Sequence, residues 1–107
     1  MSRKVILSRE AKLDILQIWN YRAEAENLAD ADGWIVKLEA VVRSLDENPE
    51  RGHYPPELER VDEYNYREVH CFPYRIIYKV ARDEIVVHCV LDGRRDMQAL
   101  LCRRLVR

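Results

Sequence analysis

The fold is decided by residues 66–92, which read YREVHCFPYRIIYKVARDEIVVHCVLD. Apolar and polar residues alternate here with a period close to two, which is typical of β-strands. We therefore predict strands over residues 66–72, 74–80 and 85–91, with a tight turn joining the last two. Three strands in immediate succession favour an antiparallel meander.

Upstream of the strands, apolar residues recur every three or four positions, which is the pattern of amphipathic helices. One helix is predicted over residues 9–25 and a second over residues 31–45. The second helix is expected to end before Pro49, because a proline disfavours the helical conformation of the residue that precedes it. Trp34 falls on the apolar side of the second helix and is expected to be buried. Together the two helices predict a helical hairpin.

Shorter elements complete the pattern. Residues 4–7, KVIL, predict a strand that runs directly into the first helix, with Ser8 as its N-cap. Residues 48–64 contain three prolines and a glycine and predict a long irregular connection, and residues 97–105 predict a last helix. The order β-α-α-β-β-β-α favours an α+β fold, with residues 1–107 as one two-layer domain that has a curved antiparallel sheet and the helical hairpin on one face.

The composition excludes several classes of protein. Of 107 residues, 48% are hydrophobic and 35% are charged, which suffices for a core and argues against disorder. No apolar run approaches the roughly 18 residues of a membrane span, or the length of a signal peptide, so we expect a cytoplasmic protein. Residues 1–64 carry nine Lys/Arg and fourteen Asp/Glu, whereas residues 65–107 carry nine and five. The basic half is where we expect an anionic partner.

No metal site and no cofactor are expected. Cys71, Cys89 and Cys102 are odd in number and far apart, so they indicate neither a disulfide framework nor a zinc ribbon. His70-Cys71 and His88-Cys89 contain residues that can bind zinc, but adjacent residues in a strand point to opposite faces. Isolated glycines cannot form a phosphate-binding loop.

Four arginines lie on or just after the predicted strands, namely Arg67, Arg75, Arg94 and Arg95. Neighbouring strands can gather their guanidinium groups on the sheet face opposite the helices, which we expect to be open. Such a cluster suits phosphate or another anion, because each guanidinium offers a planar fork of donors. The alternative is a solvated face with ordinary ion pairs, and composition alone favours it.

Short motifs follow one another in a characteristic order: VILSREA (5–11), DILQIWNY (14–21), LDENPERG (45–52), YREV (66–69), YRIIYKV (74–80) and VLDGRRD (90–96). In this order and spacing they resemble the RelE/ParE superfamily of toxins from type II toxin–antitoxin systems, often described as plasmid stabilisation proteins. The resemblance covers nearly the whole chain. It implies the same β-α-α-β-β-β-α fold that the periodicity predicts.

The resemblance implies one of two activities. RelE-like toxins cleave messenger RNA on the ribosome, with strand arginines on the scissile phosphate and acid–base groups near the C-terminal end. ParE-like toxins instead poison DNA gyrase and need no catalytic set. By motif, Arg67 and Arg75 stand where the ribonucleases bind phosphate. Asp92 stands where many members have His, and a carboxylic acid with an ordinary pKa of ~4 is a poor proton donor at neutral pH.

This departure, together with a net charge of only -1, favours the ParE-like branch. We therefore predict a toxin that inhibits DNA gyrase, is not itself an enzyme and is neutralised by a cognate antitoxin. One alternative is a metal-independent endoribonuclease acting on ribosome-bound mRNA, in which the four arginines hold the phosphate and Glu68 or Asp92 transfers protons. Another is a family member without toxicity that only binds an antitoxin.

The resemblance also implies that a C-terminal segment of the antitoxin wraps the toxin. We expect it to enter a groove beside the helical hairpin or to add a strand to an open sheet edge. Because residues 65–107 are basic, the segment is expected to be acidic and to cover Arg67, Arg75 or Arg94–Arg95.

Overall fold

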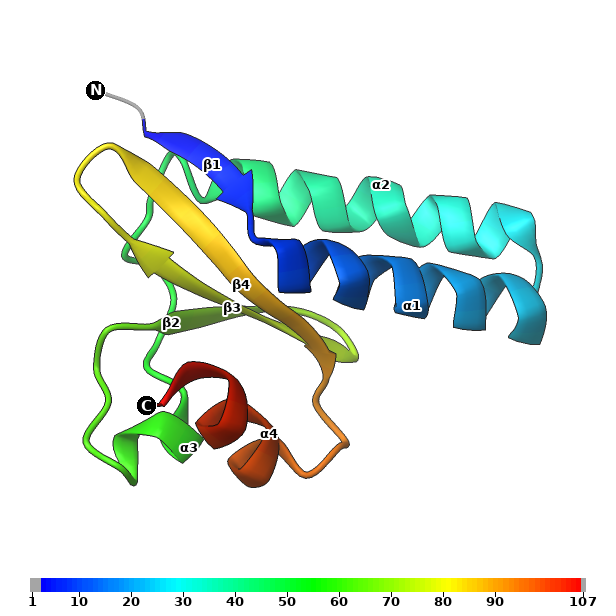
Figure 1. Cartoon of the computed structure of the whole chain (residues 1–107). Helices are drawn as coiled ribbons and strands as arrows, with labels where there is room; N and C mark the ends of the chain where they lie inside the picture. Colours follow the sequence, from blue (N-terminus) through cyan, green and yellow to red (C-terminus); the bar gives the residue numbers. More distant parts are fainter. Residues whose placement is uncertain (1–2, 107) are drawn as a thin grey trace.

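The computed structural model describes residues 3–106 as a four-stranded sheet with helices on both of its faces (Figure 1). The elements in chain order are β1 (Lys4–Leu7), α1 (Arg9–Ala25), α2 (Leu28–Ser44), α3 (Pro56–Glu59), β2 (Arg67–Cys71), β3 (Tyr74–Val80), β4 (Glu84–Asp92) and α4 (Met97–Leu105). The α+β class and the order of the predicted elements are confirmed. The structure contains one helix that was not predicted. This is α3, a single turn with Pro56 at its start, inside the connection that we expected to be irregular throughout.

The sheet is mixed, with strand order β1-β4-β3-β2. β2, β3 and β4 form the predicted antiparallel meander. β1 differs from our expectation, because it pairs with β4 in parallel, with Val5 opposite Ile85. No tight turn joins these two strands, so nothing in the connection forces an antiparallel pair.

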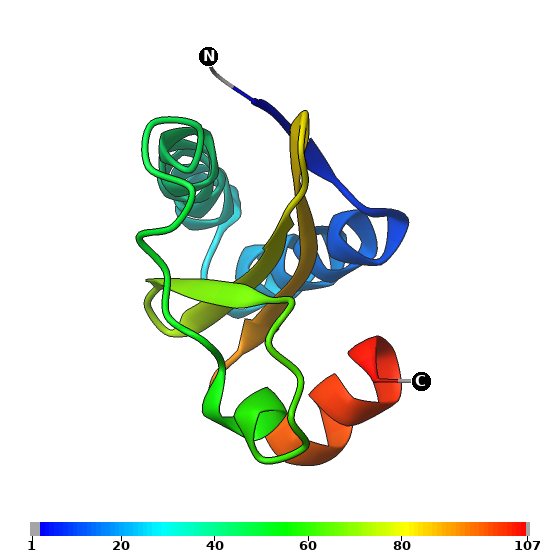
Figure 2. The ribbon, with the colours of Figure 1, turned by 90° about the vertical axis from the view of Figure 1, so that its left-hand side faces the viewer.

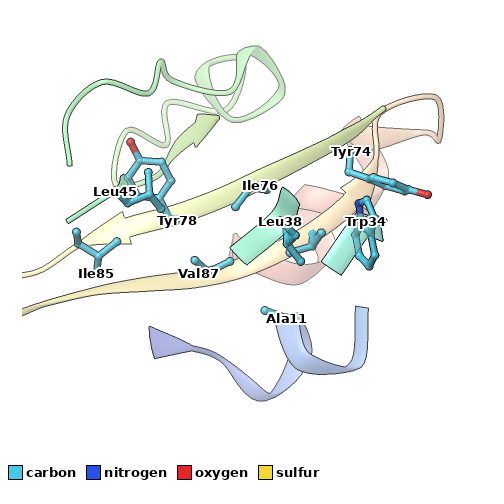
Figure 3. Packing of buried hydrophobic residues seen from close by; sticks show 10 residues of the cluster. Ala11, Trp34, Leu38, Leu45, Tyr74, Ile76, Tyr78, Ile85 and Val87 are labelled. Carbon is cyan, nitrogen blue, oxygen red and sulfur yellow. The ribbon is translucent and has the colours of Figure 1, made fainter. Parts of the chain in front are cut away.

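α1 and α2 lie side by side against one face of the sheet (Figure 1). Ser8 caps α1 as predicted, since its side chain accepts a hydrogen bond from the Ala11 amide at 3.1 Å. Trp34 is 4% exposed, which confirms that it is buried. The core on this face is formed by Ala11, Trp34, Leu38, Leu45, Tyr74, Ile76, Tyr78, Ile85, Val87 and Val90 (Figure 3). Within residues 3–106, no helix combines the length and the apolar composition needed to cross a bilayer.

The opposite face of the sheet carries α3 and α4, which contact each other (Figure 2). A second buried cluster forms there from Leu58, Ile77, Cys89, Leu91, Met97, Leu100 and Leu101. Our expectation of an open face is therefore wrong. The physical reason lies in β3, where the adjacent residues Ile76 and Ile77 point to opposite faces and each needs apolar cover; both are fully buried.

The connection between α2 and β2 is attached to the outer edge of β2. His53 and Glu68 exchange backbone hydrogen bonds of 3.2 and 2.7 Å. The Tyr78 hydroxyl donates to the Pro49 carbonyl at 2.7 Å and accepts the Gly52 amide at 3.1 Å. Gly52 has no room for a side chain, because a Cβ there would lie 2.5 Å from the Tyr78 hydroxyl and 2.6 Å from the Glu68 carbonyl oxygen. The connection is thus held close to the sheet.

Candidate functional site

Arg75 is the centre of a buried ion-pair network on the α3 side of the sheet. Its Nε and Nη2 atoms donate to the two oxygens of Glu68, at 2.7 Å each. Its Nη1 and Nη2 atoms donate to the two oxygens of Glu57, at 2.8 and 2.6 Å. The side chains of Arg75 and Glu57 are each 14% exposed and that of Glu68 is 1% exposed. The Arg75 guanidinium therefore joins β3 to both α3 and β2.

The two carboxylates leave this guanidinium little capacity for a further anion. A guanidinium has five N–H donors, and these hydrogen bonds use four of those of Arg75. Hydrogen bonding to Arg75 lowers the pKa of Glu57 below 4.5, and hydrogen bonding to Glu57 raises the pKa of Arg75. The prediction that Arg75 lies on an open face is wrong, because α3 covers it.

Two histidines flank the Glu68 carboxylate. His70 follows on the same face of β2 and places Nε2 3.1 Å from Oε1, whereas His53 comes from the connection and places Nδ1 3.9 Å from Oε2. Their rings meet edge to face with centroids 5.5 Å apart. The side chains of His53 and His70 are 60% and 57% exposed, so both imidazoles approach the buried carboxylate from the solvent side. We call His53, Glu68 and His70 the His–Glu cluster. Such a group can exchange protons or ligate a metal ion.

The His–Glu cluster lines two surface hollows. One has a volume of about 280 Å³ and is also lined by Arg51. The other has a volume of about 470 Å³ and extends past Arg75 to Phe72 and Arg94. Phe72 is 92% exposed in the turn between β2 and β3. The cluster is therefore open to solutes.

Asp92 and Arg94 form a separate, exposed ion pair at the end of β4. Arg94 Nη2 lies 2.6 Å from Asp92 Oδ2, and the Arg94 backbone amide and Nε donate to Oδ1 at 2.9 Å. The hydrogen bond from the Arg94 side chain lowers the pKa of Asp92 below 3.8. The Asp92 carboxyl is thus ionised at neutral pH and is not a proton donor. Both residues and the exposed Arg95 line a hollow of about 290 Å³.

Arg67 lies apart from the other three arginines. Its guanidinium donates to the Gly52 carbonyl at 2.9 Å and lies over the Tyr54 ring, 4.7 Å from the centroid. Arg67 and Glu68 are neighbours in β2 and so point to opposite faces. In the structure Arg67 holds the connection against the sheet.

The predicted site residues are thus only partly brought together. Arg75 and Arg94 line one hollow, and Asp92, Arg94 and Arg95 line another. The structure does not test the catalytic or anion-binding roles that we predicted for these residues and for Arg67, and those roles stay predictions.

The sequence patterns did not point to His53 or Glu57, and they drew attention to His70 only as a neighbour of Cys71. A usable signal was present in β2, since Glu68 and His70 are two residues apart in a strand and must share a face. No comparable signal exists for His53 and Glu57, because both lie in the proline-rich connection, whose path depends on tertiary contacts.

Comparison with known proteins agrees with the fold. The solved structure described as "Chromosomal ParDE TA system from P. aeruginosa" has a TM-score of 0.68 to this chain at 15% identity, over 83% of this chain and 94% of that chain. At that identity the likeness concerns the fold alone. No curated protein matches the chain significantly in sequence.

A family match covers most of the sequence. The family described as "ParE toxin of type II toxin-antitoxin system, parDE" matches residues 5–97. The match spans the hairpin and the sheet from the second residue of β1 onward, and it ends at Met97, the first residue of α4. The chain belongs to the ParE toxin family of type II toxin–antitoxin systems.

Proposed function

We propose that this toxin inhibits DNA gyrase by binding to it, with no chemistry of its own. Membership of the ParE toxin family supports the toxin role. The observation that carries the choice of mechanism is the pairing of the arginines: Arg75 is held by Glu57 and Glu68, and Arg94 by Asp92. A ribonuclease needs cations free to stabilise the phosphate in the transition state. Here carboxylates of the same chain pair with two of the four predicted arginines, and the pairing of Arg75 is buried. A gyrase target also implies action in the cytoplasm.

Supercoiling of relaxed plasmid by purified gyrase tests this proposal. We expect added toxin to reduce supercoiling and to trap a cleaved gyrase–DNA complex in proportion to its concentration. The matched control is toxin mixed beforehand with the product of a small neighbouring reading frame, the candidate antitoxin. Unchanged supercoiling and no cleaved complex at an excess of folded toxin would overturn the proposal.

We further propose that the antitoxin binds in a groove beside the helical hairpin. A hollow of about 510 Å³ lies between β1 and the helices, and its apolar lining is Val5, Leu7, Ile15, Ile35, Leu38 and Val42. β1 is an edge strand, and no other described strand pairs with its outer side. An extended segment added along β1 would place alternate side chains in this hollow.

The acidic character of that segment remains part of the proposal, with one change. Arg75 is 14% exposed and already paired with Glu57, so the proposal now relies on the other arginines. Arg94 is 76% exposed, and Arg95 and Arg67 are accessible in part. Affinity should therefore fall as salt rises and then level off, because the apolar contacts persist. Titration calorimetry with the antitoxin at low and high salt measures this. Affinity independent of ionic strength would refute the electrostatic part.

Ribosome-dependent cleavage of mRNA is the second candidate, and one observation favours it. The His–Glu cluster offers two exposed imidazoles beside a buried carboxylate, and these are residue types that serve as general acids and bases. Primer extension on translated messages after induction tests it, with the double variant His53→Ala/His70→Ala as the matched control. Codon-positioned cuts that vanish in the variant would establish cleavage. Intact messages in growth-arrested cells would exclude mRNA cleavage as the activity.

A family member without toxicity is the remaining alternative. Induction without the antitoxin separates it from both toxins, because either toxin arrests growth. Normal growth with abundant folded protein would support this alternative over both.

A further inference from the structure

We propose that the His–Glu cluster is a binding site for a divalent transition metal, with Zn²⁺ as the natural choice. This inference is independent of the toxin's target. It revises our expectation from the sequence that no metal site is present.

The ligand atoms are already close together. One nitrogen of His53, one of His70 and an oxygen of Glu68 lie within 4.8 Å of one another. Around a tetrahedral Zn²⁺ with ligands at ~2.1 Å, neighbouring ligand atoms are about 3.4 Å apart. The pair Glu68 Oε1 and His70 Nε2, at 3.1 Å, is near that spacing. His53 Nδ1 lies 3.9 Å from Glu68 Oε2 and 3.2 Å from the Tyr54 carbonyl oxygen, so this ring must turn away from that carbonyl to bind a metal. Both imidazoles are largely exposed and can turn to close the remaining distance.

The carboxylate is held in place for this role. Glu68 is 1% exposed and receives two hydrogen bonds of 2.7 Å from Arg75, which fix the plane of the carboxylate. Each carboxylate oxygen can accept a second contact, and His70 Nε2 already lies 3.1 Å from Oε1. Hydrogen bonds from a second layer of residues commonly orient metal ligands in this way.

Charge also favours a cation at this place. Arg75 by itself would repel a metal ion, but the carboxylate of Glu57 lies on its other side at 2.6 Å. The group of Arg75, Glu57 and Glu68 therefore carries a formal charge of −1, and an imidazole that ligates a metal does so without charge. A divalent cation bound here lies next to a group whose formal charge is negative.

The types of ligand select the metal. Two imidazoles and one carboxylate suit Zn²⁺, Co²⁺ or Ni²⁺, whereas Mg²⁺ and Ca²⁺ prefer oxygen ligands alone. The flanking hollows of about 280 and 470 Å³ leave space for a water as a further ligand. A bound ion would link the connection, through His53, to β2, through Glu68 and His70, and so stabilise the folded state.

Titration calorimetry of the untagged, EDTA-treated full chain with ZnCl₂ tests the proposal. We expect one ion per chain, with a Kd on the order of 1 μM or tighter. His53→Ala and His70→Ala should each weaken binding by roughly tenfold or more, and since both side chains are exposed these variants should fold. The matched control is His88→Gln, which removes the histidine that the fold places elsewhere and should bind zinc like the wild type.

Two further measurements make the result decisive. Co²⁺ should give the visible spectrum of a tetrahedral nitrogen–oxygen site without a thiolate charge-transfer band, which excludes binding at Cys71 or Cys102. Zn²⁺ should raise the melting temperature of the wild type and leave that of the double variant His53→Ala/His70→Ala unchanged. Binding only at millimolar zinc, binding that survives the double variant, or a thiolate band would overturn the inference. None of these readouts depends on gyrase or on toxicity, so they separate this inference from the proposed function.

Discussion

Arg104 donates from Nη1 to both carboxylate oxygens of Asp14, at 2.9 and 3.0 Å, across 90 residues of sequence. Asp14 also accepts the Val90 amide at 3.0 Å, and Arg104 Nη2 donates to the His88 carbonyl at 2.8 Å. β1 pairs with β4 only as far as Val87. The two side chains therefore continue along the β4 edge where β1 ends, satisfy its backbone groups and attach α4 to α1.

Replacing Arg104 by Ala should destabilise the fold strongly, because it leaves the buried Asp14 carboxylate without its partner. We expect the free energy of unfolding to fall by about 3–5 kcal/mol. Urea denaturation measures the change. Arg103→Ala, at the exposed neighbouring position, should change it by less than about 0.5 kcal/mol. Equal loss in the two variants would contradict the assigned pairing.

Arg75→Ala should also be destabilising. If Arg75 lay on an open sheet face, the same substitution would leave the melting temperature nearly unchanged. The substitution leaves two buried carboxylates, Glu57 and Glu68, facing each other without a cation, at an expected cost of about 3–5 kcal/mol. Thermal melts by circular dichroism measure it. Arg94→Ala is the control, since that side chain is 76% exposed and its loss should move the melt little. A wild-type melt for Arg75→Ala would mean that α3 does not cover Arg75.

Gly52→Ala and Gly33→Ala should have opposite effects. At Gly52 the added methyl would lie 2.6 Å from the Glu68 carbonyl oxygen, so the connection must move away from β2 at an expected cost of about 1–3 kcal/mol. At Gly33, inside α2, nothing lies within 4 Å, and alanine should stabilise the helix by roughly 0.5–1 kcal/mol. Chemical denaturation of both variants compares them. Stabilisation of both would show that the connection is not held against the sheet.

Trp34→Ala should cost about 3–5 kcal/mol, because it opens a cavity between α2 and the sheet. Trp34 is 4% exposed and its ring lies 5.2 Å from that of Tyr74. The control on the same helix is Val36→Ala, at a side chain 67% exposed, which should be nearly neutral. Denaturant midpoints for the two variants should therefore differ widely. Similar midpoints would place the buried side of α2 elsewhere.

His88 should make stability depend on pH. Burial lowers its pKa below 6.5, so the unfolded chain binds a proton there more readily than the folded protein does. The free energy of unfolding should therefore fall as pH drops below about 6.5 and level off below the folded pKa. The slope should be present in the wild type between about pH 5 and 7 and absent in His88→Gln. Denaturation at closely spaced pH values measures both; a slope retained in His88→Gln would assign it to another group.

The periodic parts of this fold could be predicted from the sequence, and the reasons are local. Helical spacing in α1 and α2 and alternation in β2, β3 and β4 follow from which side chains need burial. The partner of β1 could not be predicted, since four apolar residues fit either direction of pairing. α3 is a single turn, stabilised by packing against α4 rather than by its own periodicity.

The site was harder to predict than the fold. Arg67 and Arg75 were recognised by motif, yet their burial and partners depend on Glu57 and Gly52, which lie in the connection. Nothing in the spacing of those residues fixes the path of the chain between Pro49 and Tyr66. The register of β2 with β3, which sets His70 opposite Arg75, could not be predicted from the sequence either.

The parallel pairing of β1 with β4 has a consequence for the order in which the protein is made. Val5 cannot form its strand pair until Ile85 has been synthesised. Synthesis of the roughly 80 residues between them takes roughly 4 to 16 s at ~5–20 residues per second. During that interval the hairpin has no complete sheet to pack on, because β4, the strand that joins β1 to the rest of the sheet, is still missing. We therefore expect the nascent chain to be harmless while it is still being translated, and messages broken upstream of β4 to yield inert fragments. On this expectation, the antitoxin needs to meet only finished chains.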